Sequence, residues 1–169
     1  EYPERKFTIG LPLQLGMYDL APFWYGIFTE LGFNVKFSGF SSRDLYLRGQ
    51  DSIPSDTVCY PAKLMHGHIH KLIDDKVDAI FAPCLTYNVK EEGGDNHYNC
   101  AVVAYYPELL KDNMDELKEI KFIQPFLHIK EEKELVRELQ MYLPEEFGRF
   151  GKKELRKAVR AGWDLYYKF

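Results

Sequence analysis

The sequence predicts an α/β fold, a three-layer Rossmann-like domain with a mainly parallel sheet of four or five strands. Strand-like segments alternate along the chain with segments of helical periodicity. The run "VDAIFAPC" at 77–84 is apolar throughout, which is typical of a strand buried on both faces of a parallel sheet. The 169 residues are enough for one domain with a sizeable core.

The chain opens with a strand and then a helix. "KFTIGLPLQL" at 6–15 begins as a β-rich run, and its glycine and first proline indicate that it turns into a loop. A helix is predicted over 21–32, where Pro22 suits the first turn and Gly32 the C-terminal cap. The aromatic residues gathered at 18–28 could line a pocket for an organic ligand. Because aromatic residues at helical spacing usually form core, we expect core here.

The middle of the chain predicts a second strand and two more helices. "FNVKFSGF" at 33–40 alternates apolar and polar residues, as a strand with one buried face does. Ser41 to Asp44 form a capping box for a short helix that ends near Gly49. A longer helix is expected from Pro61. Its predicted core-facing seam is Ala62, Met65, Ile69, Leu72 and Ile73.

The second half of the chain continues the alternation. "CAVVAYY" at 100–106 is a further apolar run, which would add a strand to the sheet. A helix is expected at 107–117, a strand interrupted by a proline at 120–129, and a helix at 131–143. A last helix is expected within 151–169. Its apolar stripe is Leu155, Val159, Trp163 and Tyr166.

Composition and charge exclude several classes of protein. The net charge of −4 gives no electrostatic reason to expect nucleic acid or an anionic membrane as a partner. No apolar run approaches the ~20 residues of a membrane span, and Glu1 to Lys6 contain no signal peptide. An odd count of three cysteines favours free thiols or ligands over disulfides, so a reducing, cytoplasmic location is expected.

The domain organisation expected from the sequence is one α/β domain over 1–169, cut from a larger multidomain protein. The chain begins with Glu1 and not with methionine. The C-terminal helix within 145–169 has no stop signal before the last residue, so we expect it to continue into the next domain.

The usual catalytic motifs are missing from the sequence. It contains no GxxxxGK[ST] loop, no GxGxxG after the first strand, no GxSxG and no HExxH. The chain is therefore not expected to bind ATP by itself, and no constellation of residues marks it as an enzyme.

Three cysteines carry the most informative pattern. Cys59 lies two residues before Pro61, where a helix N-terminus lowers the pKa of a thiol and favours the thiolate that binds metal. Cys84 follows the buried strand 77–83, at the sheet edge where α/β domains bind ligands. Cys100 ends the polar loop that begins beside Cys84, so this loop could bring the two sulfurs together.

Two arguments oppose a shared cysteine site. The spacings of 25 and 16 residues match no CxxC pattern, and free cysteines are often simply buried as small hydrophobes. In addition, if 101–106 is a parallel strand, Cys100 lies at the end of the sheet opposite to Cys84. The site then requires this segment to run antiparallel, or to be short and displaced.

Histidines accompany the cysteines. His66 and His70 lie four residues apart on one helix face, a spacing that can bind zinc, while His68 points elsewhere. No neighbouring acidic residue or CxxC completes such a site, so capping, packing or solvent exposure is the favoured interpretation. His97 lies close to Cys100 and could donate a hydrogen bond to sulfur or act as a ligand, but it could equally stabilise the loop.

Several segments resemble one family, in order along the chain. They are "IGLP…MYDLAPFW", "LGFNVKFSGFSSRDLY", "IPSDTVCYPAKLMHGHI", "VDAIFAPCLTY" and "DNHYNC…YPELLKDNMD". They are similar to the CoA-enzyme-activase domain of uncharacterised function in large 2-hydroxyglutaryl-CoA dehydratase activator-like proteins, which are related to acyl-CoA dehydratase and benzoyl-CoA reductase activases. The similarity is strong over about residues 7–118 and weaker beyond.

The resemblance implies a role beside ATP-driven, low-potential electron transfer in anaerobes. In this family the domain lies beside ATPase modules and a dehydratase-like segment, which are the partners it implies; nucleic acid and membrane are not among them. By analogy with the dehydratase subunits, Cys59, Cys84 and Cys100 would be ligands of a 4Fe–4S cluster. His97, Tyr98 and Lys63 would then surround it. The phosphate-binding loops of the ATPase modules are absent, so ATPase activity does not carry over.

Three classes of function are compatible with the sequence. The first is a redox component that holds an iron–sulfur cluster in an activator of 2-hydroxyacyl-CoA dehydratase-type enzymes. The second is a scaffold or docking module of the same complex without metal. The third is an enzyme or binding domain for a small ligand.

Overall fold

The computed structural model describes residues 7–90 and 93–169; the expected strand start at Lys6 and the segment from Glu1 lie outside these ranges. Four strands form one sheet in which every pairing is parallel, in the order β2-β1-β3-β4. The strands are β1 (Thr8–Leu11), β2 (Asn34–Phe37), β3 (Ala79–Phe81) and β4 (Lys121–Ile123). The predicted α/β class and the mainly parallel sheet are confirmed.

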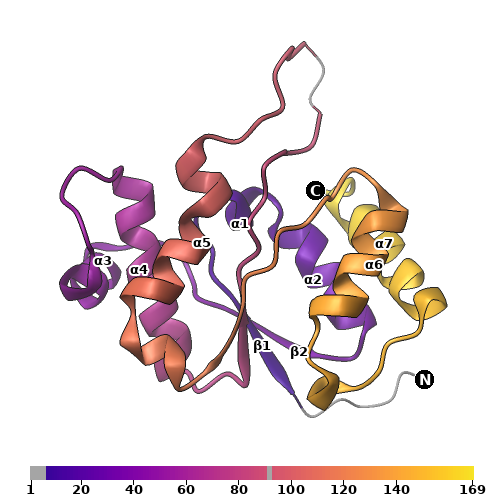
Figure 1. Ribbon diagram of the computed structural model, residues 1–169, viewed down its shortest axis with the longest axis horizontal. Helices are drawn as coiled ribbons and strands as arrows, with labels where there is room; N and C mark the ends of the chain where they lie inside the picture. The colour runs from indigo at the N-terminus through magenta and orange to yellow at the C-terminus, as the bar shows by residue number, and fades with distance from the viewer. Residues whose placement is uncertain (1–6, 91–92) are drawn as a thin grey trace.

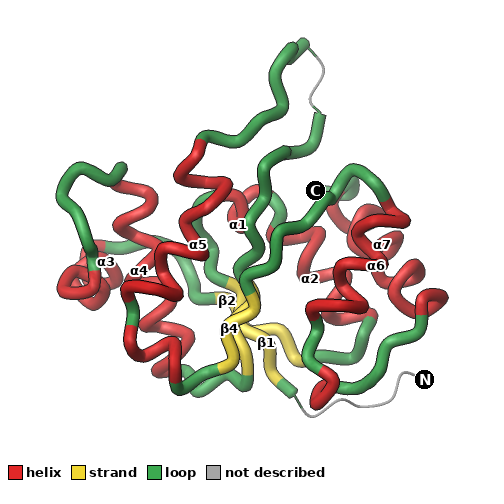
Figure 2. Tube along the Cα trace, viewed as in Figure 1, coloured by secondary structure: helices red, strands yellow, loops and turns green. Residues whose placement is uncertain are grey.

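Seven α-helices cover the two faces of the sheet in the described part of the chain. Figure 1 shows α3, α4 and α5 on one side of the sheet and α2, α6 and α7 on the other, and Figure 2 shows the strands between them. This arrangement is the predicted three-layer architecture. The helices are α1 (Gly16–Asp19), α2 (Ala21–Glu30), α3 (Arg43–Gly49), α4 (Tyr60–Asp74), α5 (Ala101–Asn113), α6 (Glu132–Tyr142) and α7 (Lys152–Tyr166).

Each face of the sheet has its own hydrophobic core. One core includes Phe23, Trp24 and Phe28 of α2, packed with side chains of α6, α7 and the strands. The prediction of core is confirmed for Phe23, Trp24 and Phe28, whereas Tyr18 and Tyr25 are exposed. The second core lies between the sheet and α4 and α5, and it contains four of the five residues of the predicted α4 seam, with Ile73 packed at its margin.

Two close helix contacts depend on glycine. Gly26 of α2 lies against α7, where an added Cβ would come within 2.8 Å of the Gly162 Cα atom. Gly67 of α4 lies against α3, where an added Cβ would overlap the carbonyl oxygen of Leu45. Any larger residue at either position must push two backbones apart.

The prediction of a strand at 100–106 is wrong, because this segment forms the first half of α5. Cys100 is the N-cap, and its sulfur accepts a hydrogen bond from the Val103 N–H over 3.5 Å. The buried residues Ala104, Pro107 and Leu110 recur at the three- to four-residue spacing of a helix. Pro107, which we expected to begin the helix, lies inside it.

Other helix boundaries differ little from the prediction. The N-cap of α3 is Ser42 and not Ser41, with the Ser42 Oγ atom accepting a hydrogen bond from the Leu45 N–H over 3.1 Å. The predicted helices at 131–143 and within 151–169 are present as α6 and α7. No helix within residues 7–90 and 93–169 is both long and apolar enough to cross a membrane.

Candidate functional site

Two of the three cysteines are N-caps of neighbouring helices. Cys59 precedes the first residue of α4 and Cys100 precedes the first residue of α5, and both side chains are exposed. In a parallel α/β sheet, the helix after a strand begins at the carboxyl edge. The expected position of Cys59 at a helix N-terminus is therefore confirmed. The geometric objection to Cys100 disappears, because this residue begins a helix at the same edge and not a strand at the opposite edge.

Hydrogen bonds hold Cys100 next to the segment that follows Cys84. The Asn99 N–H donates to the Thr86 carbonyl over 2.9 Å, and the Asn99 side-chain amide donates to the Leu85 carbonyl over 2.8 Å. Further out, the Asn88 N–H donates to the His97 carbonyl over 2.9 Å. These bonds join two arms, 85–90 and 93–99, which project beyond the sheet in Figure 1.

Cys84 itself is buried. Its N–H donates to the Pro125 carbonyl over 2.8 Å and its carbonyl accepts from the Leu127 N–H over 3.2 Å, so the strand pairing continues past β3 and β4. Burial raises the pKa of the Cys84 thiol to about 11; the nearby Glu108 backbone N–H acts in the opposite direction, and the Glu108 carboxylate adds to the rise. The thiol is protonated at neutral pH unless a metal replaces the proton.

The positions of the three cysteines can be compared through their neighbours on α5. Cys100 Sγ contacts the Val103 N–H, whereas Cys84 lies beside the Glu108 N–H. These two N–H groups are five residues apart, or about 7.5 Å along the helix axis. Cys59 is close enough to α5 for its charge to act on Tyr106, whose pKa is raised to about 12, chiefly by burial. Cys100 thus lies at the start of α5, whereas Cys84 lies beside the middle of this helix.

The three sulfurs do not form a ready-made metal site. Among residues 7–90 and 93–169, no group of three or more His, Cys, Asp or Glu side chains is arranged so that it could hold a metal ion. The structure thus brings the segments around Cys84 and Cys100 together and places Cys59 on the adjacent helix. Whether these cysteines bind a cluster stays a prediction.

The residues expected around the cysteines have other contacts. Tyr98 packs against Tyr87, with ring centroids 4.5 Å apart and a hydrogen bond of 3.2 Å between the hydroxyl groups. Lys63 Nζ donates to the Asp56 carbonyl over 2.8 Å, in the loop before Cys59. His97 lies partly exposed in the outer arm. Tyr98 and His97 are thus near Cys100 in the chain, while Lys63 stabilises the approach to α4.

His66 belongs to a buried hydrogen-bond chain whose direction can be derived. The Ser52 hydroxyl donates to the Gly49 carbonyl over 2.9 Å, so its oxygen is left to accept from His66 Nδ1–H over 2.8 Å. His66 Nε2 then carries no proton and accepts from the Tyr106 hydroxyl, 2.8 Å away. Burial lowers the pKa of His66 to about 4, with a further contribution from His70.

His68 is fully buried and connects two loops at the carboxyl edge. Its Nδ1 lies 2.7 Å from Ser38 Oγ and its Nε2 lies 2.9 Å from Ser41 Oγ. Ser38 Oγ already accepts a hydrogen bond from the Leu13 N–H over 2.8 Å. The Ser38 hydroxyl is therefore best assigned as the donor to His68 Nδ1. Burial lowers the pKa of His68 to about 4, so the imidazole is neutral at physiological pH.

These contacts show the structural role of His66 and His68 in α4. Each buried ring is hydrogen-bonded at both nitrogens to hydroxyl groups, with no lone pair left for a metal. The favoured interpretation from the sequence is capping, packing or solvent exposure, and His66 and His68 are packed in the interior. The sequence held no signal for the partners, because Ser38, Ser52 and Tyr106 lie 30, 14 and 40 residues away from the histidines they contact.

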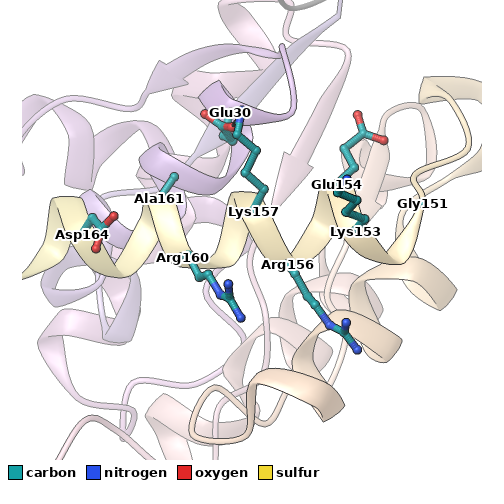
Figure 3. A pocket seen from close by; sticks show the side chains of 9 residues that line it. All are labelled: Glu30, Gly151, Lys153, Glu154, Arg156, Lys157, Arg160, Ala161 and Asp164. Atoms are coloured by element: carbon teal, nitrogen blue, oxygen red, sulfur yellow. Dashed lines mark ion pairs between the residues drawn. The ribbon is translucent and has the colours of Figure 1, made fainter.

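A pocket of about 890 Å³ lies on the outer surface of α7, away from the cysteines (Figure 3). Charged residues line it, and Lys157 and Glu30 form an ion pair with an N–O distance of 2.8 Å. Arg160, also in the lining, pairs with Glu132 over 3.2 Å. The lining contains no cysteine or histidine. We therefore do not regard this pocket as the functional site.

Comparisons with known proteins identify a family for the chain. No curated protein and no solved structure matches the chain. One family does match, over residues 8–169, and its description supports a role in the activation of CoA-dependent enzymes. The chain belongs to the family of the CoA enzyme activase uncharacterised domain.

Proposed function

We propose that this domain is a non-ATPase component of an ATP-driven activator of 2-hydroxyacyl-CoA dehydratase-type enzymes, in which Cys59, Cys84 and Cys100 hold a 4Fe–4S cluster. The observation that supports the proposal is that Cys59 and Cys100 are the N-caps of neighbouring helices, while Cys84 lies where the strand pairing continues past β3 and β4. The membership of the chain in an activase family supports the wider role.

The donor set fits an iron–sulfur cluster in its chemistry. Thiolates are the ligands of such clusters, and three of them leave one iron open to water, substrate or a neighbouring chain. Cys59 and Cys100 lie at helix N-termini, where unpaired N–H groups and the helix dipole stabilise a thiolate. When bound, the cluster would supply low-potential electron transfer.

The chain's own groups would tune the three ligands differently. The Val103 N–H already donates to Cys100 Sγ and would lower the electron density on that sulfur. Cys84 must release its proton, because burial keeps its thiol neutral in the free protein. We therefore expect loading to release protons and to be favoured at high pH. The ATPase modules and the dehydratase-like segment of the same complex are the proposed partners, in the cytoplasm of an anaerobe.

Anaerobic reconstitution with iron and sulfide tests the proposal. The wild-type chain should take up close to four iron and four sulfide ions, as a 4Fe–4S cluster requires, and gain the visible absorption of a cluster. The variants Cys59→Ser, Cys84→Ala and Cys100→Ser should each lose most of it. Asp95→Ala is the matched control, since Asp95 is exposed in the same loop and is not expected near the cluster. Equal iron content in the wild type and the three cysteine variants would refute the cluster.

A metal-free docking module is the second candidate. The observation that favours it is the burial of Cys84, with no ready-made metal site among the described residues. This function predicts that the ATPase modules bind the domain equally well with all three cysteines substituted. Loss of binding on removal of the domain, with no metal found, would support it.

A further inference from the structure

One side of strand β4 has no neighbouring strand among the described residues, because β4 ends the sheet. The hydrogen bonds to the β3 side come from alternate residues. The Ala82 N–H donates to the Ile123 carbonyl over 3.0 Å, and the Cys84 N–H donates to the Pro125 carbonyl. Because strand residues alternate in direction, the N–H and C=O groups of Phe122, Gln124 and Phe126 point to the open side.

The proline of this strand does not protect the open edge. Proline commonly blunts edge strands because it lacks an N–H. Pro125, however, is in register with the inward-facing residues, where its carbonyl accepts from Cys84. The outward row of backbone groups is thus complete over five residues of extended chain.

A groove of about 390 Å³ follows this edge between α5 and the end of α6. Glu108 and Lys111 of α5 line one wall, and Tyr142 and Pro144 line the other. The Gln124 side chain lies within it. Its amide is best paired when the nitrogen donates to the Phe122 carbonyl and the oxygen accepts from Lys111 Nζ, each over 3.0 Å.

Exposed apolar side chains gather along the same edge. Phe126 is on the strand itself, and its ring lies 5.7 Å from that of Tyr105 on α5. Three large side chains that this ring contact or the lining of the groove places at the edge are 41–49% exposed: Tyr105, Phe126 and Tyr142. At the other end of the sheet, the ring of Phe37 on β2 is covered by the stacked ring of Tyr25. An apolar border on both sides of an open edge is typical of an interface.

We propose that this edge is a dimer interface, at which β4 of a second copy of the chain pairs antiparallel across a twofold axis at Gln124. Gln124 then lies opposite Gln124 of the second copy, and Phe122 lies opposite Phe126. Each of the three residue pairs exchanges two N–H···O bonds, and the two sheets become continuous. The Gln124 side chain turns away and releases the Phe122 carbonyl and Lys111.

The charges on α5 identify a second copy as the partner. A twofold axis perpendicular to the sheet places α5 of one copy antiparallel to α5 of the other. Glu108 and Lys111 are one helical turn apart and both line the groove, so Glu108 of each copy faces Lys111 of the other. The surface is therefore complementary to itself in charge as well as in its backbone groups. This inference does not depend on the proposed cluster.

Sedimentation velocity under reducing conditions tests the dimer when the concentration of the 169-residue chain is varied about hundredfold. The wild type should change from monomer to dimer. Glu108→Lys and Lys111→Glu each place like charges face to face and should raise the dissociation constant about tenfold or more. The double variant E108K/K111E restores opposite charges and should return to within about threefold of the wild type. A wild type that stays monomeric throughout would overturn the proposal.

Hydrogen exchange locates the interface. The amides of Phe122, Gln124 and Phe126 should exchange at least about tenfold more slowly in the dimer than in the diluted monomer. Gln124→Pro removes an outward N–H without removing a bond to β3, so it should fold and stay monomeric. A dimer that survives Gln124→Pro, or one in which these three amides exchange equally at all dilutions, would place the interface elsewhere and refute the pairing.

Discussion

Mild acid should destabilise this domain through the two buried histidines of α4. Burial depresses the pKa of His66 and of His68 from 6.5 to about 4, while the unfolded chain keeps the ordinary value. Between these two values the unfolded state binds protons that the folded state excludes. The stability contributed by the neutral rings is therefore complete above pH 6.5, and it is lost as the pH falls from 6.5 towards 4.

The magnitude follows from the two pKa values. Between pH 7 and pH 5 each histidine should remove up to about 2 kcal/mol from the free energy of unfolding, or about 4 kcal/mol together. Small domains are stable by only about 5–15 kcal/mol, so this loss is a large part of the total. Free carboxylic acids titrate mainly below pH 5, so histidine dominates this pH window.

Urea unfolding followed by circular dichroism at half-unit steps from pH 7.5 to pH 5 measures the effect. His68→Gln removes one of the two groups and should remove about half of the pH dependence. His97→Ala is the matched control, because His97 is partly exposed in the projecting arm. A free energy of unfolding that stays constant from pH 7 to pH 5 in the wild type would refute the argument. So would an unchanged slope in His68→Gln.

Three further pairs of substitutions test the packing around the site. Gly67→Ala should cost about 3 kcal/mol or more, because its Cβ overlaps the Leu45 carbonyl. Gly151→Ala meets nothing within 4 Å and should cost only the ~1 kcal/mol typical of alanine at a helix N-cap; thermal unfolding compares the two variants. Tyr106→Phe leaves His66 Nε2 without its donor and should cost about 1–3 kcal/mol, while Tyr105→Phe, at an exposed position, should not change the unfolding midpoint in urea. Equal unfolding midpoints for Tyr106→Phe and Tyr105→Phe would show that the hydrogen bond from Tyr106 to His66 adds no stability. Cys59→Ser should be neutral or slightly stabilising, because serine is a better N-cap than cysteine. Cys84→Ser should destabilise the domain by about 1–2 kcal/mol, because it places a hydroxyl group in a buried position. A less stable Cys59→Ser than Cys84→Ser in denaturant titrations would contradict the environments assigned to the two cysteines.

The parts of the fold with long or unambiguous patterns were predictable from sequence. The buried strand around Ala79 and the helix that begins before Pro61 have lengths and periodicities that only one structure satisfies. The segment 100–106 is too short and too uniformly apolar to separate strand from helix. Its cap is a cysteine, which is not among the usual N-cap residues. Pro107 strengthened the error, because proline is expected at the first turn and not in the middle of a helix.

The candidate site likewise combines features that the local sequence predicts with features that depend on distant residues. The sequence placed Cys59 at a helix N-terminus from the local proline, and the structure confirms it. The environment of Cys84 includes Glu108 of α5 and the backbone of Pro125 and Leu127, which lie far from it in the sequence, beyond the reach of local patterns. The contacts of His66 and His68 depend on loops that come together only after the sheet has formed, so no spacing rule could predict them.

The two arms that project beyond the sheet have a mechanical consequence. They are joined at their base by the bonds from Asn99 to Leu85 and Thr86, and the next residue is the N-cap of α5. A force applied at the far ends of the arms produces a torque at this hydrogen-bonded base. Any torque that parts Asn99 from Thr86 must break two hydrogen bonds and lift Cys100 away from Cys84. The geometry around the cysteines is thereby linked to whatever touches the arms at their far end.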